Sequence, residues 1–148
     1  MGKNIIICHD PDNLGGVKLI NETLMVSGKV EHISRRIKDW LKNYAHNILV
    51  HKVRSMAATL DASFGRISIR DNRSSWGSCS SQGNITFSWR LIMAPEPVVD
   101  YVAAHEVAHL VYLNHSKDFW DTVGSLDANY QQSKNWLRIN GELLQRVG

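Results

Sequence analysis

Three histidines and one glutamate form the pattern in this chain with the most specific chemistry. His105, Glu106 and His109 follow the spacing HExxH, and His115 stands six residues later. On a helix, residues four apart lie on one side about one turn apart, so the first two histidines can bind one metal ion together. Glu106 would lie beside them, where its carboxylate can take a proton from water. These residue types at this spacing predict a metal site that performs hydrolysis.

His115 completes the expected ligand set. Three neutral imidazoles leave a fourth tetrahedral position for water, which is typical of catalytic rather than structural zinc sites. We therefore expect one zinc ion per chain, held by His105, His109 and His115, with Glu106 as the catalytic base. The competing interpretation makes the histidines core residues bonded to backbone carbonyls. The apolar sequence around them disfavours it, because unpaired polar groups are costly there.

The segment that carries HExxH is predicted to form a buried helix. Residues 94–97 read Ala-Pro-Glu-Pro, and both proline and an acidic residue suit the first turn of a helix. The sequence that follows is apolar on nearly all sides, as in a central helix. We expect this helix to continue to about Leu113 and the chain to turn at Asn114. Ser116 is the expected N-cap of a short helix, and residues 129–147 are expected to form a final one.

The remaining elements follow from hydrophobic periodicity. Apolar residues recur every three or four positions over roughly 31–60, which predicts a long amphipathic helix. Residues 18–27 fit a short hairpin, and residues 66–70 and 85–90 alternate like half-buried strands. The stretch 71–84 is rich in Ser, Gly and Asn, so we expect a loop joining an antiparallel pair. One of the two strands is expected to form a sheet edge beside the metal, where an extended peptide could add.

Length and composition limit the class of protein. The chain has 148 residues, of which 43% are hydrophobic and 21% charged, a balance that fits one globular domain rather than disorder or a fibrous repeat. No stretch approaches the roughly 18 apolar residues of a membrane-spanning helix. The apolar run near the start is too short for a signal-peptide core. Cys8 and Cys79 form no disulfide framework. We therefore expect a cytoplasmic protein without a membrane partner.

Several further motifs occur in a fixed order around the histidines. They are Ile69-Arg70-Asp71, Ser75-Trp76-Gly77-Ser78-Cys79, Gly83-Asn84-Ile85, Trp89-Arg90-Leu91, Asn114-His115-Ser116 and Phe119-Trp120. Together with HExxH, this order resembles the YgjP-like zinc metallopeptidases, which are related to the SprT-like proteases and to the wider gluzincin-like enzymes. The resemblance runs from about residue 30 to residue 141, and residues 1–29 match the family's β-rich beginning only loosely.

The resemblance implies a fold and an activity. It implies an α+β, zincin-like domain over residues 1–148, with a small antiparallel sheet packed against a long N-terminal helix and a central HExxH helix, followed by C-terminal helices. It also implies that His105, His109 and His115 bind zinc, that Glu106 is the base, and that the substrate is a peptide or protein. The histidine spacing equals that of the metzincins, but Tyr112 stands where their sharp turn needs glycine. We therefore exclude that group.

Two other functions compete with peptide hydrolysis. Residues 1–74 hold 12 Lys and Arg against 7 Asp and Glu, so a metal-stabilised nucleic-acid-binding module is one alternative. A zinc hydrolase of a non-peptide bond is the other. Glu106 disfavours a binding module, because a purely structural metal site needs no carboxylate beside its ligands. The sequence leaves the substrate and the oligomeric state open.

Five residues near the motifs have open roles. Cys79 is a fourth ligand, an inhibitory thiol or a packing residue. Trp76 and Trp89 either line a substrate cleft or pack under the active helix. Arg73 or Arg90 holds either a substrate carboxylate or an internal aspartate.

A second group of polar residues lies close to the ligands in sequence. Asn114, Ser116 and Asp118 are candidates to orient a ligand imidazole, although capping already explains Ser116. Tyr101 and Tyr112 are candidates to stabilise an oxyanion. We expect both tyrosines on helix faces other than that of the first HExxH histidine, which argues against this role.

Overall fold

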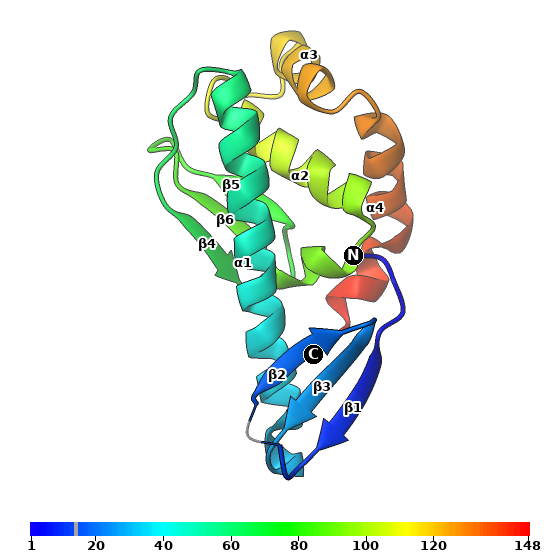
Figure 1. Ribbon diagram of the computed structural model, residues 1–148. Helices are drawn as coiled ribbons and strands as arrows, with labels where there is room; N and C mark the ends of the chain where they lie inside the picture. Colours follow the sequence, from blue (N-terminus) through cyan, green and yellow to red (C-terminus); the bar gives the residue numbers. More distant parts are fainter. Residues whose placement is uncertain (14) are drawn as a thin grey trace.

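The computed structural model describes residues 1–13 and 15–148. Its elements in chain order are β1 (Ile6–Asp10), β2 (Val17–Ile20), β3 (Thr23–Ser27), the 3₁₀ helix η1 (Val30–His32), α1 (Ile33–Thr59), β4 (Ile67–Arg70), β5 (Gly77–Cys79), β6 (Ile85–Ser88), the 3₁₀ helix η2 (Trp89–Met93), α2 (Glu96–Ala108), α3 (Lys117–Leu126) and α4 (Tyr130–Gln145). Figure 1 shows α1 running from the β1–β3 sheet at one end of the molecule toward α3 at the other. The fold is α+β, as expected, with two small mixed sheets in place of one antiparallel sheet.

The long helix α1 confirms the element predicted over residues 31–60. Its 27 residues correspond to about 40 Å of helix. The fully buried positions are Ala45, Leu49, Val53 and Ala57, which are four residues apart and form one stripe against the core. Near the other end of the helix, Ile37 and Leu41 are only half-buried.

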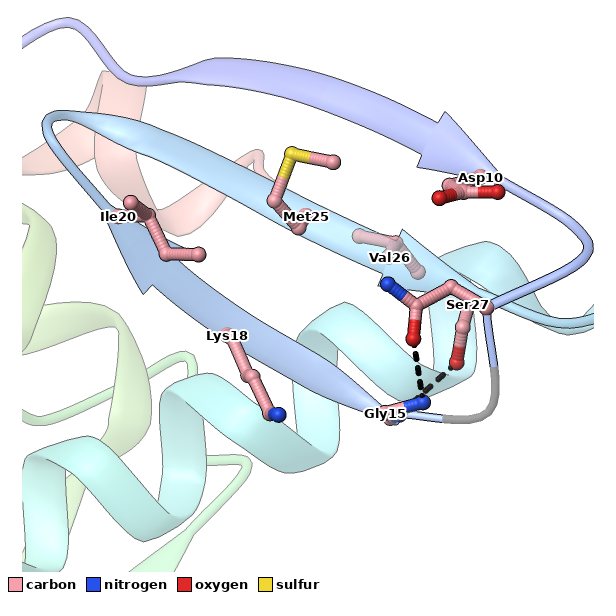
Figure 2. Close-up of a pocket in the computed structure, with 9 residues that line it drawn as sticks. Asp10, Gly15, Lys18, Ile20, Met25, Val26 and Ser27 are labelled. Atoms are coloured by element: carbon pink, nitrogen blue, oxygen red, sulfur yellow. Dashed lines mark hydrogen bonds between the residues drawn. The ribbon is translucent and has the colours of Figure 1, made fainter.

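The first sheet has the strand order β1-β3-β2 and contains the predicted hairpin. β2 and β3 pair antiparallel, and Asn21 and Glu22 between them have φ angles of 45° and 62°. Two left-handed residues are what the tight turns of hairpins require. At the open end, the hydroxyl of Ser27 accepts a hydrogen bond from the Gly16 N–H at 2.9 Å, beside the small pocket that Figure 2 shows.

The second sheet has the order β4-β6-β5, and here the predicted antiparallel pairing is wrong. β4 and β6 run parallel, in a register from Ile67 opposite Ile85 to Arg70 opposite Ser88. The reason is a third strand. β5 follows β4 in the sequence and runs in the opposite direction. β6 then pairs antiparallel with β5, so β6 runs in the direction of β4.

The predicted loop over residues 71–84 therefore contains the strand β5, which forms an edge of the second sheet. β6 is the central strand and β4 an outer one, so of the two strands named in the prediction β4 forms an edge and β6 does not. The outer edge of β4 was the other expected site for a peptide, but β4 contacts α1. β5 lies against α2, so β5 is the edge strand beside the HExxH helix.

The helices α2, α3 and α4 surround the expected site. α2 is buried on nearly all sides, as its composition predicts. It ends at Ala108 rather than near Leu113, because the next turns use tighter bonds, from Leu110 N to Val107 O and from Val111 N to Ala108 O. The predicted N-cap is confirmed, since the Ser116 hydroxyl accepts from Phe119 N. Within the described part of the chain, no helix is both long and apolar enough to cross a membrane.

Candidate metal centre

Three histidine side chains converge at the C-terminal end of α2. His105 lies in the last turn of the helix, His109 caps it, and His115 lies in the connection to α3. One nitrogen of each imidazole lies within 4.8 Å of the others. Among the residues that the structure describes, this is the one cluster of three or more His, Cys, Asp or Glu with metal-binding spacing. The structure thus brings together the three histidines that the sequence singled out.

The spacing of these nitrogens suits a small divalent metal ion. The Nε2 atoms of His105 and His115 are 3.1 Å apart. Tetrahedral zinc with Zn–N bonds of about 2.0–2.1 Å would hold two ligand nitrogens roughly 3.3 Å apart. The ring centroids of the three imidazoles are 4.8 to 5.0 Å from one another. The donor set therefore fits a three-histidine metal site with little rearrangement.

A backbone carbonyl fixes the orientation of His109. Its Nδ1 lies 2.9 Å from the carbonyl oxygen of Tyr112. A carbonyl oxygen only accepts, so Nδ1 carries the proton and the lone pair is on Nε2. Such a hydrogen bond to the second ring nitrogen is usual for metal-binding histidines. The turn after Ala108 therefore supplies the orienting group that we sought among Asn114, Ser116 and Asp118.

The pKa values of two of the three histidines are lowered. Burial lowers the pKa of His105 to about 4, and the neighbouring charges of His109, His115 and Lys134 act in the same direction. The pKa of His115 is also lowered, first by burial and then by His109 and Lys134. Metal ions bind the neutral imidazole, so these histidines are in the binding form at neutral pH.

Glu106 lies on the buried side of α2 and directly follows His105 in the sequence. It is 5% exposed, and burial raises its pKa to about 8. Within the described chain, no hydrogen bond or ion pair joins its carboxyl group to another side chain. A carboxyl group with a pKa near neutrality can both accept and donate a proton at physiological pH. Glu106 therefore has the properties of a general base.

Gly77 on β5 makes the space that Glu106 occupies. A Cβ atom at position 77 would lie 2.5 Å from Oε1, 2.7 Å from Cγ and 2.9 Å from Cδ of Glu106. All three distances are shorter than real contacts of a Cβ atom. The edge strand and the HExxH helix can approach this closely because residue 77 has no side chain.

An aromatic wall lines the other side of the histidines. We use this name for Tyr101, Trp120 and Tyr130, from α2, α3 and α4. The ring of Trp120 stacks on His115 at 5.8 Å and on Tyr130 at 5.6 Å between centroids. Tyr130 stacks in turn on Tyr101, whose ring meets His105 edge-on at 6.0 Å. The wall fixes the positions of two ligand imidazoles.

The expectation that Tyr101 faces away from His105 is therefore wrong. Residues 101 and 105 are four apart, so they lie on the same side of α2. Burial, followed by the charges of Glu106 and Tyr130, raises the pKa of Tyr101 to about 12. The hydroxyl group of Tyr101 is accordingly protonated at neutral pH.

Four of the residues with open roles lie outside the histidine cluster. Trp89 is 2% exposed, and the pocket that it borders lies beside the first half of α1 rather than at the histidines. Arg90 is fully buried, donates to Asp71 at 2.5 Å and holds an internal aspartate. Arg73 donates to the carbonyl of Gly148. Cys79 is half-buried, packs on the core, and is not part of the metal-type cluster.

Trp76 packs against the last helix. Its indole lies beside Gly141 of α4, where an added Cβ atom would approach Cζ2 to 3.3 Å. The side chain is half-buried and contacts the main core. Gly141 is therefore the point at which α4 accommodates the indole.

Two residues beside the cluster, Gly77 and Lys134, were not identified as part of the site from the sequence. Gly77 lies in a stretch rich in loop-type residues, and its contact with Glu106 depends on tertiary structure. Lys134 stands over the ring of Trp120, with Nζ 4.0 Å from the centroid. The four-residue spacing between Tyr130 and Lys134 was the available signal, since it places both on one face of α4.

The comparison with protein families gives one match. The model of the YgjP-like metallopeptidase domain matches residues 1–140, which include the first sheet as well as the histidine cluster. No curated protein and no solved structure matches the chain.

Proposed function

Because the chain belongs to the YgjP-like metallopeptidase family, we propose that it is a zinc-dependent peptidase that hydrolyses bonds in a peptide or protein substrate. One observation carries the proposal: three converging imidazole nitrogens lie at one end of α2, and a buried carboxyl group without a side-chain partner follows the first of them. A site that only stabilised the fold would have no use for that carboxyl group.

His105, His109 and His115 would hold the zinc ion through one nitrogen each. When bound, zinc supplies Lewis acidity, which polarises the scissile carbonyl and makes a water molecule more acidic. The Tyr112 carbonyl keeps the Nε2 lone pair of His109 available. The stacking of Trp120 on His115 orients a ligand that lies outside any helix.

Glu106 would transfer the proton during hydrolysis. Its carboxylate accepts a proton from the attacking water at one oxygen and then gives it to the nitrogen of the leaving amine. A pKa of about 8 means that burial strengthens the base relative to an exposed glutamate. The contact with Gly77 limits the positions that the carboxyl group can take.

The edge strand β5 supports a binding mode for an extended substrate. In the described chain, β5 pairs with β6 on one side only, and it lies against α2. A peptide that hydrogen-bonds to the free edge of β5 would run past Glu106, which touches Gly77 of the same strand. This part of the binding recognises the peptide backbone.

The experiment that tests the function combines metal analysis with cleavage of an unbiased peptide library. The purified protein should contain one zinc ion per chain and should cleave library peptides, and a chelator should stop cleavage. Glu106→Gln should keep the zinc and the thermal unfolding temperature but lose at least about 10²-fold in cleavage rate, since glutamine cannot take up the proton.

Two results would contradict the proposal. If the zinc-loaded protein cleaved no peptide in the library, peptide hydrolysis would be wrong, although the metal site could stand. If Glu106→Gln cleaved as fast as the unchanged protein, the base would have to be another residue. Glu142→Gln is a matched control, because Glu142 is exposed on α4 and pairs only with Arg146 among the described residues.

A further inference from the structure

One lysine lies next to the candidate metal centre. Lys134 is exposed on α4, and its Nζ lies 4.0 Å from the centroid of the Trp120 ring. That ring is itself 5.7 Å from His105 and 5.8 Å from His115. A positive charge thus lies beside the site where substrate would react.

Among the residues that the structure describes, Lys134 pairs with no acidic side chain. The ion pairs of the described residues involve six Lys and Arg side chains, and none of these is Lys134. In the described part of the chain, its ammonium group lies against the face of Trp120. That contact holds the ammonium group in place while leaving its three N–H donors for another ligand.

The position of this charge is unfavourable for metal binding alone. A cation beside a divalent ion raises the electrostatic free energy of the site, because like charges repel. An anionic ligand, in contrast, is attracted by both the metal ion and the ammonium group of Lys134. The aromatic wall also makes the surroundings of the ammonium group apolar on one side, which strengthens a charge pair formed there.

We propose that Lys134 binds a carboxylate of the substrate, so that the enzyme prefers bonds with a carboxylate close by. The inference rests on the proposed peptidase function. The carboxylate is either the free C-terminus of a peptide or the side chain of an Asp or Glu next to the scissile bond. Lys134 is thus a specificity-determining residue, and Trp120 positions it.

The first experiment measures sequence preference. Peptide libraries with free and with amidated C-termini are cleaved by the zinc-loaded protein, and mass spectrometry locates the cleaved bonds. We expect cleavage beside Asp or Glu, or near a free C-terminus, to exceed cleavage beside Asn or Gln, or near an amide, by about tenfold or more. Amidation separates the two sources, because it removes only the terminal carboxylate.

Three variants relate this preference to Lys134. Lys134→Met keeps the apolar stem against Trp120 and should lose the preference. Lys134→Arg keeps the charge and should retain most of it. Arg138→Met removes an exposed positive charge one turn further along α4, where its guanidinium contacts Asn135, and should change nothing.

A second experiment needs no cleavage. Succinate and butyrate have the same carbon number and differ by one carboxylate, so calorimetry on the zinc-loaded protein can compare their affinities. The comparison tests whether a second carboxylate adds affinity through Lys134. Succinate should bind about tenfold more tightly than butyrate to the unchanged protein and to Lys134→Arg, but not to Lys134→Met.

The outcomes separate the two proposals. Equal preference and an equal succinate advantage in Lys134→Met and the unchanged protein would overturn the role of Lys134. Peptide cleavage without any preference for a carboxylate would also overturn it. If no peptide were cleaved but the succinate advantage still depended on Lys134, the peptidase function would be wrong and the carboxylate site would stand.

Discussion

Replacing Gly77 by alanine tests whether the edge strand determines the position of the general base. The added Cβ atom would lie 2.5 Å from Oε1 of Glu106 and 2.7 Å from its Cγ, where ordinary contacts begin at 3.4 Å. The carboxyl group must therefore move by roughly 1 Å, a displacement that can cost about 10²-fold in rate. The φ angle of Gly77 lies outside the left-handed region, so alanine introduces no backbone strain.

The effect should be specific to the chemistry. Overpacking a buried contact typically costs about 1–3 kcal/mol of stability, so Gly77→Ala should remain folded at room temperature. The three atoms nearest to the new methyl group all belong to Glu106 and none to a histidine, so zinc content should stay near one per chain. The expected result is a loss of about 10²-fold in kcat/KM for a library peptide, with zinc retained.

The assay compares kcat/KM, zinc content and thermal unfolding for the unchanged protein and two alanine variants. Gly124→Ala is the matched control, because its Cβ atom would meet the nearest atom of Tyr130 at an ordinary 3.6 Å. Helical alanine is also favourable, so that variant should be at least as stable as the unchanged protein. Wild-type kcat/KM in Gly77→Ala would refute the reasoning. Loss of zinc would show instead that β5 supports the ligands.

Two further predictions concern the metal and an internal ion pair. His115→Ala should bind zinc far more weakly while keeping its fold, because the side chain of His115 is exposed. A chelator should therefore lower the unfolding temperature of this variant less than that of the unchanged protein. His46→Ala, on the exposed side of α1, is the control, and an unchanged zinc affinity in His115→Ala would exclude His115 as the third ligand. Asp71→Asn should lower the free energy of unfolding at pH 7 by about 1–2 kcal/mol, a value reduced for solvent screening since the Asp71 side chain is 43% exposed. The hydrogen bond from Arg90 holds the pKa of Asp71 at about 2, so this stabilisation is present above pH 4 and is lost as the pH falls toward 2. Urea unfolding between pH 7 and pH 2 measures the difference, and a difference that grew on acidification would contradict it.

The parts of the site that lie within one helix could be predicted from the sequence. The spacing of His105 and His109 fixes their relative position as soon as the segment is helical. The cap at Ser116 is equally local, which is why it was predicted correctly. The position of His115 depends on a turn, and the structure makes that turn earlier than expected, directly after Ala108.

The strand pairing could not be predicted in the same way. Alternation of polar and apolar residues shows that β4 and β6 are strands, but it carries no information on their direction. The direction depends on β5, whose sequence Gly77-Ser78-Cys79 contains no β-branched or aromatic residue. A strand of three such residues forms because it pairs with β6 and packs against α2.

The contacts between elements were the hardest to foresee. A glycine in a sequence usually indicates a turn or a loop. Gly77 is needed for another reason, because Glu106 of α2 occupies the space of a Cβ atom at this position. The sequence allows Arg90 to bind either a substrate carboxylate or an aspartate of the chain itself, and only the fold brings Asp71 to it. Lys134 and Trp120 meet across two helices that the sequence predicted separately.

The length of α1 divides the molecule into two regions of unequal cooperativity. Leu24 and Val26 of the first sheet are buried, yet they lie outside the main core, which collects around the other half of α1. Ile6 and Ile20 in the same sheet are more than half exposed. A region with so few buried side chains has a smaller free energy of local opening than α2. The first sheet can therefore unfold and refold as a unit while the histidines keep their arrangement. Opening of α2, in contrast, would separate them at the cost of global unfolding.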